Sequence, residues 1–231
     1  MSTKTPEIPV RNKIPIPCKV ILVGESGSGK TSIISRYLKN IYNDNPISTL
    51  SPLSLSKNVI IDGYNINLEI WDTAGQEKYR SITTLFYKDA LICILVYDIT
   101  KKDSFEKIQR YWHFSVTENG VKGLILGVAG NKSDLYENEE VSEKEAKEYS
   151  DYINAPFMLV SAKINSGIDE LFNKLVNKFI ESEFMKKLIP EYINEEDNKL
   201  WERSKSKIKL ENKDKDDEVN DNKKKKKKKF C

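Results

Sequence analysis

The chain has 231 residues, of which 39% are hydrophobic and 32% are charged. This length and composition predict one folded domain with a long polar extension, and they exclude a chain that is disordered throughout. The longest apolar run, Ala90–Tyr97, is far shorter than the roughly 20 residues of a transmembrane helix, and the polar N-terminus predicts no secretory signal. Three cysteines, Cys18, Cys93 and Cys231, are too few for a disulfide framework and indicate a reducing, cytosolic compartment.

The charge of the chain is distributed unevenly. Residues 204–231 contain 12 lysines and 6 acidic residues and carry a net charge of +6, whereas the preceding residues carry −3. Seven of these lysines, Lys223–Lys229, are consecutive. Attraction to a polyanion is therefore expected in this segment, which could also be an ordinary solvated charge run or a nuclear localisation signal.

Strands and helices alternate in the middle of the chain. Residues 1–17 are polar and rich in proline, and they predict a flexible lead. In chain order, the apolar patterns then predict strand Lys19–Val23, helix Lys30–Asn40, a hairpin of Asn58–Asp62 and Asn65–Trp71, strand Leu91–Tyr97, helix Phe105–Val116, strand Leu124–Ala129, helix Val141–Tyr152, strand Phe157–Val160 and helix Ile168–Phe184. This alternation predicts an α/β domain over residues 18–184, with a mostly parallel six-stranded sheet and helices on both faces. Residues 185–231 are charged and poor in apolar side chains, and they predict a flexible basic tail.

A glycine-rich loop joins the first strand to the first helix. Its sequence, Gly24–Thr31, fits the pattern G-x-x-x-x-G-K-[ST] of a phosphate-binding loop, in the strand-to-helix context that the pattern requires. Backbone N–H groups of such a loop converge on phosphate oxygens, and the helix N-terminus adds a positive end. We expect Lys30 to reach the β- and γ-phosphates and the Thr31 hydroxyl to bind Mg²⁺. The phosphate-binding residues predicted in this loop are Ser26, Gly27, Ser28, Gly29, Lys30, Thr31 and Ser32.

A second motif, Asp72-Thr-Ala-Gly-Gln76, follows a strand of the predicted hairpin. A carboxylate at Asp72 can hold Mg²⁺ through a water, and the backbone at Gly75 can approach the γ-phosphate. Gln76 would then orient an attacking water, so Gln76 and Lys30 are the expected catalytic residues. The pattern D-x-x-G is weak by itself, but its order after a phosphate loop makes it specific.

Two polar segments that follow later strands predict the recognition of a guanine base. In the first, Asn131–Asp134, one carboxylate at Asp134 can accept both donors on the edge of guanine, N1–H and the N2 amino group. Adenine lacks both donors and would leave the carboxylate unpaired, so discrimination of about 10⁴ or more is expected. A backbone N–H of the second segment can donate to the guanine O6. The base-binding residues predicted in these segments are Asn131, Lys132, Asp134, Ser161, Ala162 and Lys163.

The three motifs and their order resemble those of a Ras-superfamily small GTPase, and more narrowly those of a Rab. The closest likeness lies in Asn67–Thr83, Tyr87 and Val96–Thr100, and the resemblance runs from Cys18 to Phe184. It implies the P-loop NTPase fold of small GTPases, binding of GTP and GDP with Mg²⁺, slow hydrolysis of GTP, and a role as a switch in membrane traffic.

The resemblance also implies roles for the loop after the first helix. Thr49 falls at the switch-I threonine, whose hydroxyl binds Mg²⁺ and whose backbone senses the γ-phosphate, and Tyr42 falls where an aromatic ring lies across the guanine. The stretch that follows Thr49 departs from the usual I-G-V-D-F: Ser51 replaces the glycine, and Ser54 replaces the phenylalanine of an aromatic triad that faces effectors. The other two triad positions are taken to be Trp71 and Tyr87.

Rab proteins usually carry prenyl groups on C-terminal cysteines, and this chain ends in a single one, Cys231. A lone lipid anchors weakly, but the lysine run can supply a second attraction to the cytosolic face of an endomembrane. The resemblance implies an exchange factor, a GTPase-activating protein and effectors as partners of a monomer, with no nucleic acid. Two alternatives remain: a GTP-binding scaffold that barely cycles because switch I has diverged, and a nuclear or polyanion-binding module that acts through the lysine run.

Overall fold

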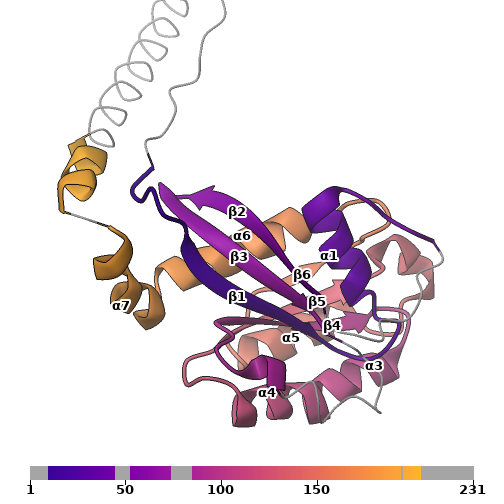
Figure 1. The fold of residues 1–231 in the computed structure, drawn as a ribbon. Coiled ribbons are helices and arrows are strands. Elements are labelled where there is room, and N and C mark those ends of the chain that lie inside the picture. Colours follow the sequence, from indigo (N-terminus) through magenta and orange to yellow (C-terminus); the bar gives the residue numbers. More distant parts are fainter. Residues whose placement is uncertain (1–9, 45–52, 74–84, 194, 204–231) are drawn as a thin grey trace, which may run out of the picture.

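The structure is a computed structural model that describes residues 10–44, 53–73, 85–193 and 195–203 (Figure 1). Its six strands form one sheet in the order β2-β3-β1-β4-β5-β6, in which only β2 runs antiparallel to its neighbour. The strands are β1 (Ile16–Val23), β2 (Leu53–Ile61), β3 (Tyr64–Asp72), β4 (Ile92–Asp98), β5 (Ile125–Asn131) and β6 (Phe157–Leu159). The α/β class, the mostly parallel sheet and the hairpin are therefore confirmed.

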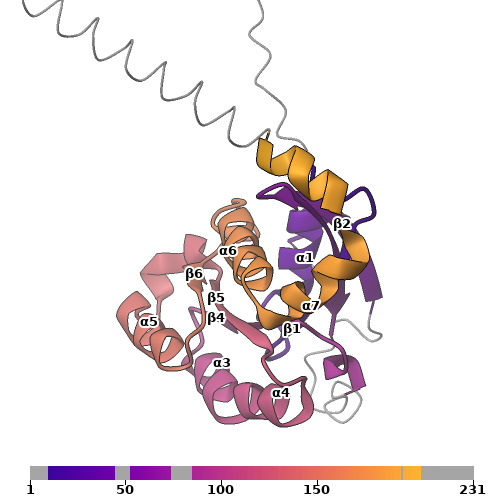
Figure 2. The ribbon, with the colours of Figure 1, turned by 90° about the vertical axis from the view of Figure 1, so that its left-hand side faces the viewer.

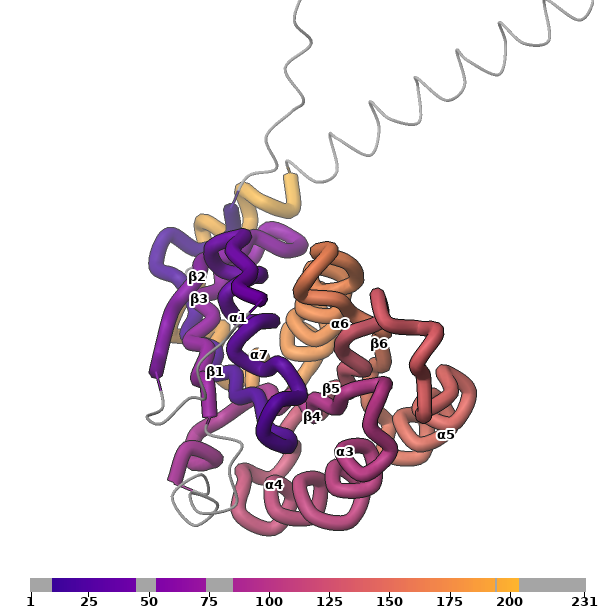
Figure 3. The backbone as a smooth tube through the Cα atoms, turned by 90° about the vertical axis from the view of Figure 1, so that its right-hand side faces the viewer, coloured from indigo at the N-terminus to yellow at the C-terminus, as the bar shows by residue number. Residues whose placement is uncertain are grey.

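Helices cover both faces of the sheet (Figures 2 and 3). They are α1 (Lys30–Lys39), α3 (Lys102–Lys107), the π-helical η2 (Ile108–Trp112), α4 (His113–Asn119), the short 3₁₀ η3 (Ser133–Asn138), α5 (Glu143–Tyr152), α6 (Ile168–Ile180) and α7 (Glu183–Tyr192). Helices α1 and α6 pack on one face, and α3, η2, α4 and α5 pack on the other. All seven residues of β4 are buried, because this central strand is covered on both sides.

Two of the predicted helices differ from the structure. The expected helix Phe105–Val116 extends in both directions and contains the π-helical segment η2. The expected helix Ile168–Phe184 is two helices, because the Ser182 side chain accepts a hydrogen bond from the Met185 N–H and begins α7. Apolar spacing alone does not reveal such a junction, since both helices present apolar residues to the same core.

The ordered packing extends beyond both of the expected domain ends, residues 18 and 184. Strand β1 begins at Ile16, and the buried Asn12 side chain donates to the carbonyls of Ile14 and Asn65. Beyond Ile180, α7 buries Met185, and residues 195–203 form a further helix. The predicted flexible lead and tail are thus corrected for residues 10–17, 185–193 and 195–203.

The two described ends of the chain meet at the turn between β2 and β3 (Figure 1). The Arg11 guanidinium lies 3.4 Å from the Trp201 ring centre and 4.5 Å from that of Tyr64, and it pairs with Glu202 at 3.1 Å. A Cβ at Gly63, where φ is +79°, would lie 2.1 Å from the Trp201 indole nitrogen. Trp201 is buried, so these contacts hold residues 195–203 against the hairpin turn.

Candidate functional site

The predicted site residues meet at the carboxyl ends of the parallel strands. The phosphate loop follows β1, Asp72 ends β3, Asn131 ends β5, and Ser161 lies just beyond β6. The ladder pairs Leu22 with Asp72, which places the end of β3 beside the start of the loop. In an open α/β sheet this edge is where ligands bind, so the three motifs form one candidate site.

Glycine is required at two positions of the phosphate loop. Gly24 and Gly29 have φ values of +146° and +92°, which side chains rarely adopt. A Cβ at Gly24 would lie 2.1 Å from the Val96 carbonyl oxygen, and one at Gly29 would lie 2.1 Å from Nδ2 of Asn131. Because Gly29 has no side chain to cap α1, the first N–H groups of this helix remain available to an anion.

Lys30 is the buried cation of the site, with 5% of its surface exposed. Its ammonium group donates to the carbonyls of Gly24 at 2.9 Å and Glu25 at 3.0 Å. Burial lowers the pKa of Lys30 to about 8, against the opposing attraction of Asp72 and Glu25. A bound phosphate would restore the preference for the charged form, so the lysine is poised to receive an anion.

Thr31 and Asp72, the predicted magnesium ligands, lie in direct contact. The Thr31 hydroxyl donates to a carboxylate oxygen of Asp72 at 2.7 Å, and Asp72 is 5% exposed. Hydroxyl and carboxylate oxygens are the donor set that Mg²⁺ prefers. These two residues therefore fit the ion that the sequence predicts.

The base-binding segments are joined to the phosphate loop through Asn131. The Asn131 amide donates to the Ser28 carbonyl at 2.8 Å, and its oxygen accepts from the Ala162 N–H at 3.4 Å. The Ser161 hydroxyl donates to the Asp134 carboxylate, which brings these two predicted residues together. Lys163 is exposed, and its backbone lies in the same loop.

Two residues that the sequence analysis missed support the base-binding segments. The Arg36 guanidinium, on α1, donates to the carbonyls of Ala162 at 2.8 Å and Lys163 at 3.1 Å. Asp98, buried at the end of β4, pairs with the Lys132 ammonium at 2.6 Å. Asp98 could have been predicted from the sequence, because it ends an apolar strand as Asp72 does. No local sequence pattern indicates the role of Arg36.

The remaining predicted residues are placed only in part. Tyr42 is half-buried against the core on the α1 side, and the Arg36 guanidinium lies 5.9 Å from its ring centre. Its stacking on guanine stays a prediction. Four further predicted residues lie outside the described part of the chain: Thr49, Gly75, Gln76 and Cys231.

The predicted partner-facing surface needs one correction. Tyr87 is fully buried, and its hydroxyl accepts from Ser115 at 3.4 Å, so it cannot face a partner as expected. The neighbouring Phe86 instead packs on Trp71, with 5.4 Å between the ring centres. Ser54 is exposed and lies directly opposite Trp71 in the β2–β3 ladder, which leaves this side of the indole without an aromatic neighbour on β2.

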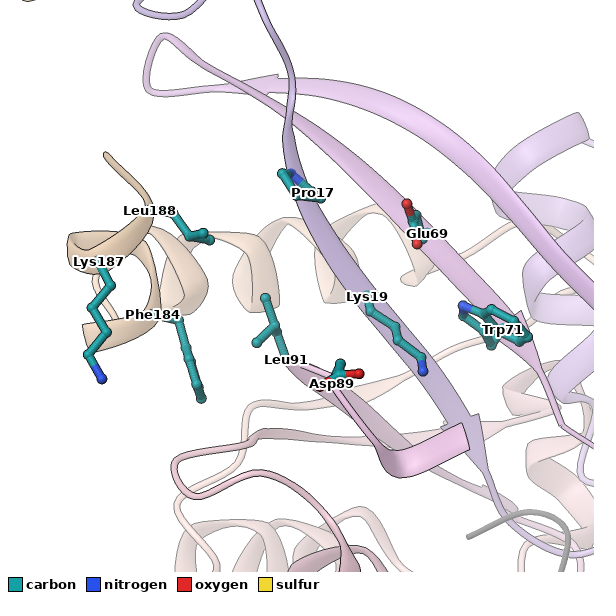
Figure 4. A pocket seen from close by; sticks show the side chains of 9 residues that line it. All are labelled: Pro17, Lys19, Glu69, Trp71, Asp89, Leu91, Phe184, Lys187 and Leu188. Carbon is teal, nitrogen blue, oxygen red and sulfur yellow. The ribbon is translucent and has the colours of Figure 1, made fainter. Parts of the chain in front are cut away.

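A groove of about 530 Å³ lies beside Trp71 (Figure 4). The sheet face contributes Trp71 and Lys19, whose ammonium is 5.1 Å from the indole ring centre, and α7 contributes Phe184 and Leu188. The groove thus lies between the sheet and α7, a helix that continues past the expected end of the domain at residue 184.

Comparison with known proteins agrees with this geometry. The sequence model of the Ras family matches residues 19–181. The chain is 42% identical to the Ras-related protein Rab-21 of Bos taurus over 164 residues, which cover 71% of this chain and 73% of the relative. It is 43% identical to a putative Ras-related protein Rab-5B of Dictyostelium discoideum over 173 residues, 74% of this chain and 79% of the relative. It is 40% identical to the Ras-related protein Rab-1C of the same organism over 164 residues, 71% and 81% of the two chains. The extent of the family match and of these identities shows that the chain belongs to the Ras family and is a Rab-type small GTPase, a GTP-binding switch of vesicle traffic.

Proposed function

We propose that the loops at the carboxyl edge of the sheet hold GTP or GDP with Mg²⁺, and that the residues of these loops have the following roles. The N–H groups of Ser26–Ser32 and the Lys30 ammonium bind the phosphates. Thr31 and Thr49 would hold the ion directly and Asp72 would hold it through a water, and the ion supplies positive charge to the phosphate oxygens. The contact between Thr31 and Asp72 at 2.7 Å, beside the buried Lys30, carries this proposal.

The base would be held by the second half of the site. Asp134 accepts the two donors of guanine, Lys132 and Asn131 shape the pocket, and the loop of Ser161–Lys163 donates to O6. The contact between Asn131 and the Ser28 carbonyl supports this assignment, because it ties the base segment to the phosphate loop. Tyr42 would cover one face of the base.

Hydrolysis would depend on residues at the phosphate end. Gln76 orients a water for in-line attack on the γ-phosphorus, and Lys30 meets the charge that develops on the phosphate oxygens. Loss of the γ-phosphate removes its contacts with Thr49 and Gly75, so both segments relax. Rab-type proteins act with exchange factors, activating proteins and effectors, and an activating partner that supplies an arginine could add about 10³–10⁵ in rate.

Chelation of Mg²⁺ tests the metal assignment. With excess EDTA we expect bound GDP to leave at least about tenfold faster, because the phosphates lose a divalent charge in a buried site. The measurement is the dissociation of a fluorescent GDP with and without EDTA. Thr31→Val, which keeps the shape but removes the hydroxyl, should release GDP quickly even with Mg²⁺ present. A release rate unchanged by both EDTA and this substitution would contradict the assignment.

The same proposal places the chain on endomembranes. Cys231 would carry a prenyl group, and Lys223–Lys229 would add attraction to anionic lipids, since one lipid chain alone binds marginally. No helix in the described part of the chain is long and apolar enough to cross a membrane. Residues 195–203 lie at the hairpin turn, at the opposite end of β1 from the phosphate loop, so this segment does not cover the nucleotide edge.

Fractionation of cells tests this membrane attachment. The wild-type chain is expected in the membrane fraction with a prenyl mass on Cys231, and Cys231→Ser is expected in the cytosol. A variant with Lys223–Lys229 changed to glutamine should keep the lipid but lose most of its membrane binding. Membrane binding that survives Cys231→Ser would contradict the proposal, and a nuclear location that depends on the lysines would favour the polyanion-binding alternative.

A further inference from the structure

The phosphate loop contains an acidic residue, Glu25, within a segment built to bind anions. Its backbone carbonyl accepts hydrogen bonds from the Ser28 N–H at 3.2 Å and the Lys30 ammonium at 3.0 Å. The Glu25 side chain therefore projects from the second residue of the loop. A carboxylate so close to bound phosphates would weaken their binding unless its charge were compensated and held away from them.

Helix α3 and the π-helical η2 that follows it supply this compensation. One carboxylate oxygen of Glu25 accepts from the Lys107 ammonium at 3.1 Å, and the other accepts from the Trp112 indole N–H at 3.1 Å. Trp112 is fully buried, and the Glu25 side chain is 16% exposed. The Lys107 ammonium also contacts Asp103 at 2.8 Å, and the hydrogen bonds that it donates to Asp103 and then to Glu25 raise its pKa, which keeps the ammonium charged.

The π-helical segment η2 explains how one helix provides both donors. Lys107 and Trp112 are five residues apart, and an α-helix would separate their directions by roughly 140° around its axis. A π-helix forms hydrogen bonds between residues five apart, so it brings such residues to the same side. The structure has η2 at Ile108–Trp112, directly after Lys107. The irregular turn therefore aims both groups at Glu25.

We propose that Lys107 and Trp112 are positioning residues of the nucleotide site: they hold the Glu25 carboxylate away from the phosphates, cancel its charge and so set how slowly the nucleotide leaves. The inference rests on the proposed nucleotide site and adds two residues that set the rate of nucleotide release. Neither residue belongs to the three motifs, and neither touches the predicted ligand. Their effect on the nucleotide passes through Glu25.

Dissociation of a fluorescent GDP from the full chain, with Mg²⁺ present, tests this role. Lys107→Met is expected to speed release about three- to tenfold, since it removes the charged partner of a largely buried carboxylate. Arg110→Met is the matched control: it removes the same charge three residues away, from a side chain that is 79% exposed and pairs only with Glu106 in the described structure. This control is expected to release GDP at the wild-type rate. Trp112→Phe keeps an aromatic ring but removes the donor, and it should also release GDP faster.

A second substitution separates positioning from simple packing. Glu25→Gln removes the charge that Lys107 compensates, so the Lys107→Met, Glu25→Gln double variant should release GDP within about twofold of Glu25→Gln alone. A packing role would leave the double variant as fast as Lys107→Met or faster. That result would overturn the positioning role, and so would equal release rates for Lys107→Met and Arg110→Met. Binding of GDP by the wild-type chain would in either case still support the nucleotide site. Failure of the wild-type chain to bind GDP would overturn both proposals.

Discussion

Replacing Lys30 with methionine is expected to weaken the binding of GDP and GTP by about a thousandfold. Methionine keeps the apolar stem but removes the buried charge that faces the phosphates, and loss of one partner of a buried ion pair costs about 4 kcal/mol. Titration calorimetry against GDP measures the change. The empty protein should melt at the same temperature or higher, because the variant removes a charge whose burial is unfavourable. A loss of less than tenfold would contradict the role of Lys30.

The same residue gives the binding reaction a dependence on pH. Burial lowers the pKa of Lys30 to about 8 in the empty site, so the ammonium loses its proton as the pH rises through this value. Bound phosphate favours the charged form, hence binding above about pH 8 must take up a proton. Calorimetry at pH 9 in two buffers of different ionisation enthalpy measures this uptake, which should be absent in Lys30→Met.

Replacing Asp134 with asparagine is expected to abolish the preference for guanine, with a loss of about 10⁴ in affinity for GTP. The carboxylate can accept from both N1–H and the N2 amino group, whereas an amide offers one acceptor and one donor. The amide instead matches the edge of xanthine, which has a carbonyl in place of the amino group. Competition between guanine, xanthine and adenine nucleotides measures the change, and we expect xanthine nucleotides to bind best.

Ser161 offers a control for the Asp134 substitution. Its hydroxyl donates to the Asp134 carboxylate, so Ser161→Ala removes a neighbour of the carboxylate without removing the acceptor. This variant should weaken GTP binding by at most about tenfold and keep the guanine preference. If Asp134→Asn still preferred guanine over xanthine, the Asp134 carboxylate would not determine the preference for guanine.

The nucleotide site was predictable because its signals are local. Gly24–Thr31, Asp72 and Asn131–Asp134 each lie at the end of an apolar strand, and parallel strands bring such ends to one edge. Arg36 and the contact of Glu25 with Trp112 were not predictable in the same way. They join residues up to 126 positions apart, and which side chains meet depends on how the helices pack.

The errors have similar physical causes. Phe86 and Tyr87 are adjacent aromatic residues, and only packing decides that Tyr87 is buried while Phe86 contacts Trp71. The charged segment after residue 184 predicts that the packed domain ends there. One buried aromatic residue, Trp201, is enough to dock residues 195–203, and a single aromatic in a polar segment gives no periodic signal.

Single-turnover hydrolysis of GTP by the purified chain, beside Gln76→Leu, distinguishes a working switch from a scaffold. We expect slow cleavage of bound GTP by the wild-type chain, markedly slower cleavage by the variant, and similar GTP affinity for both. This result would establish a working switch despite Ser51 and Ser54. Tight GTP binding with no cleavage, even when activating proteins are added, would contradict the account and support a GTP-bound scaffold that barely cycles.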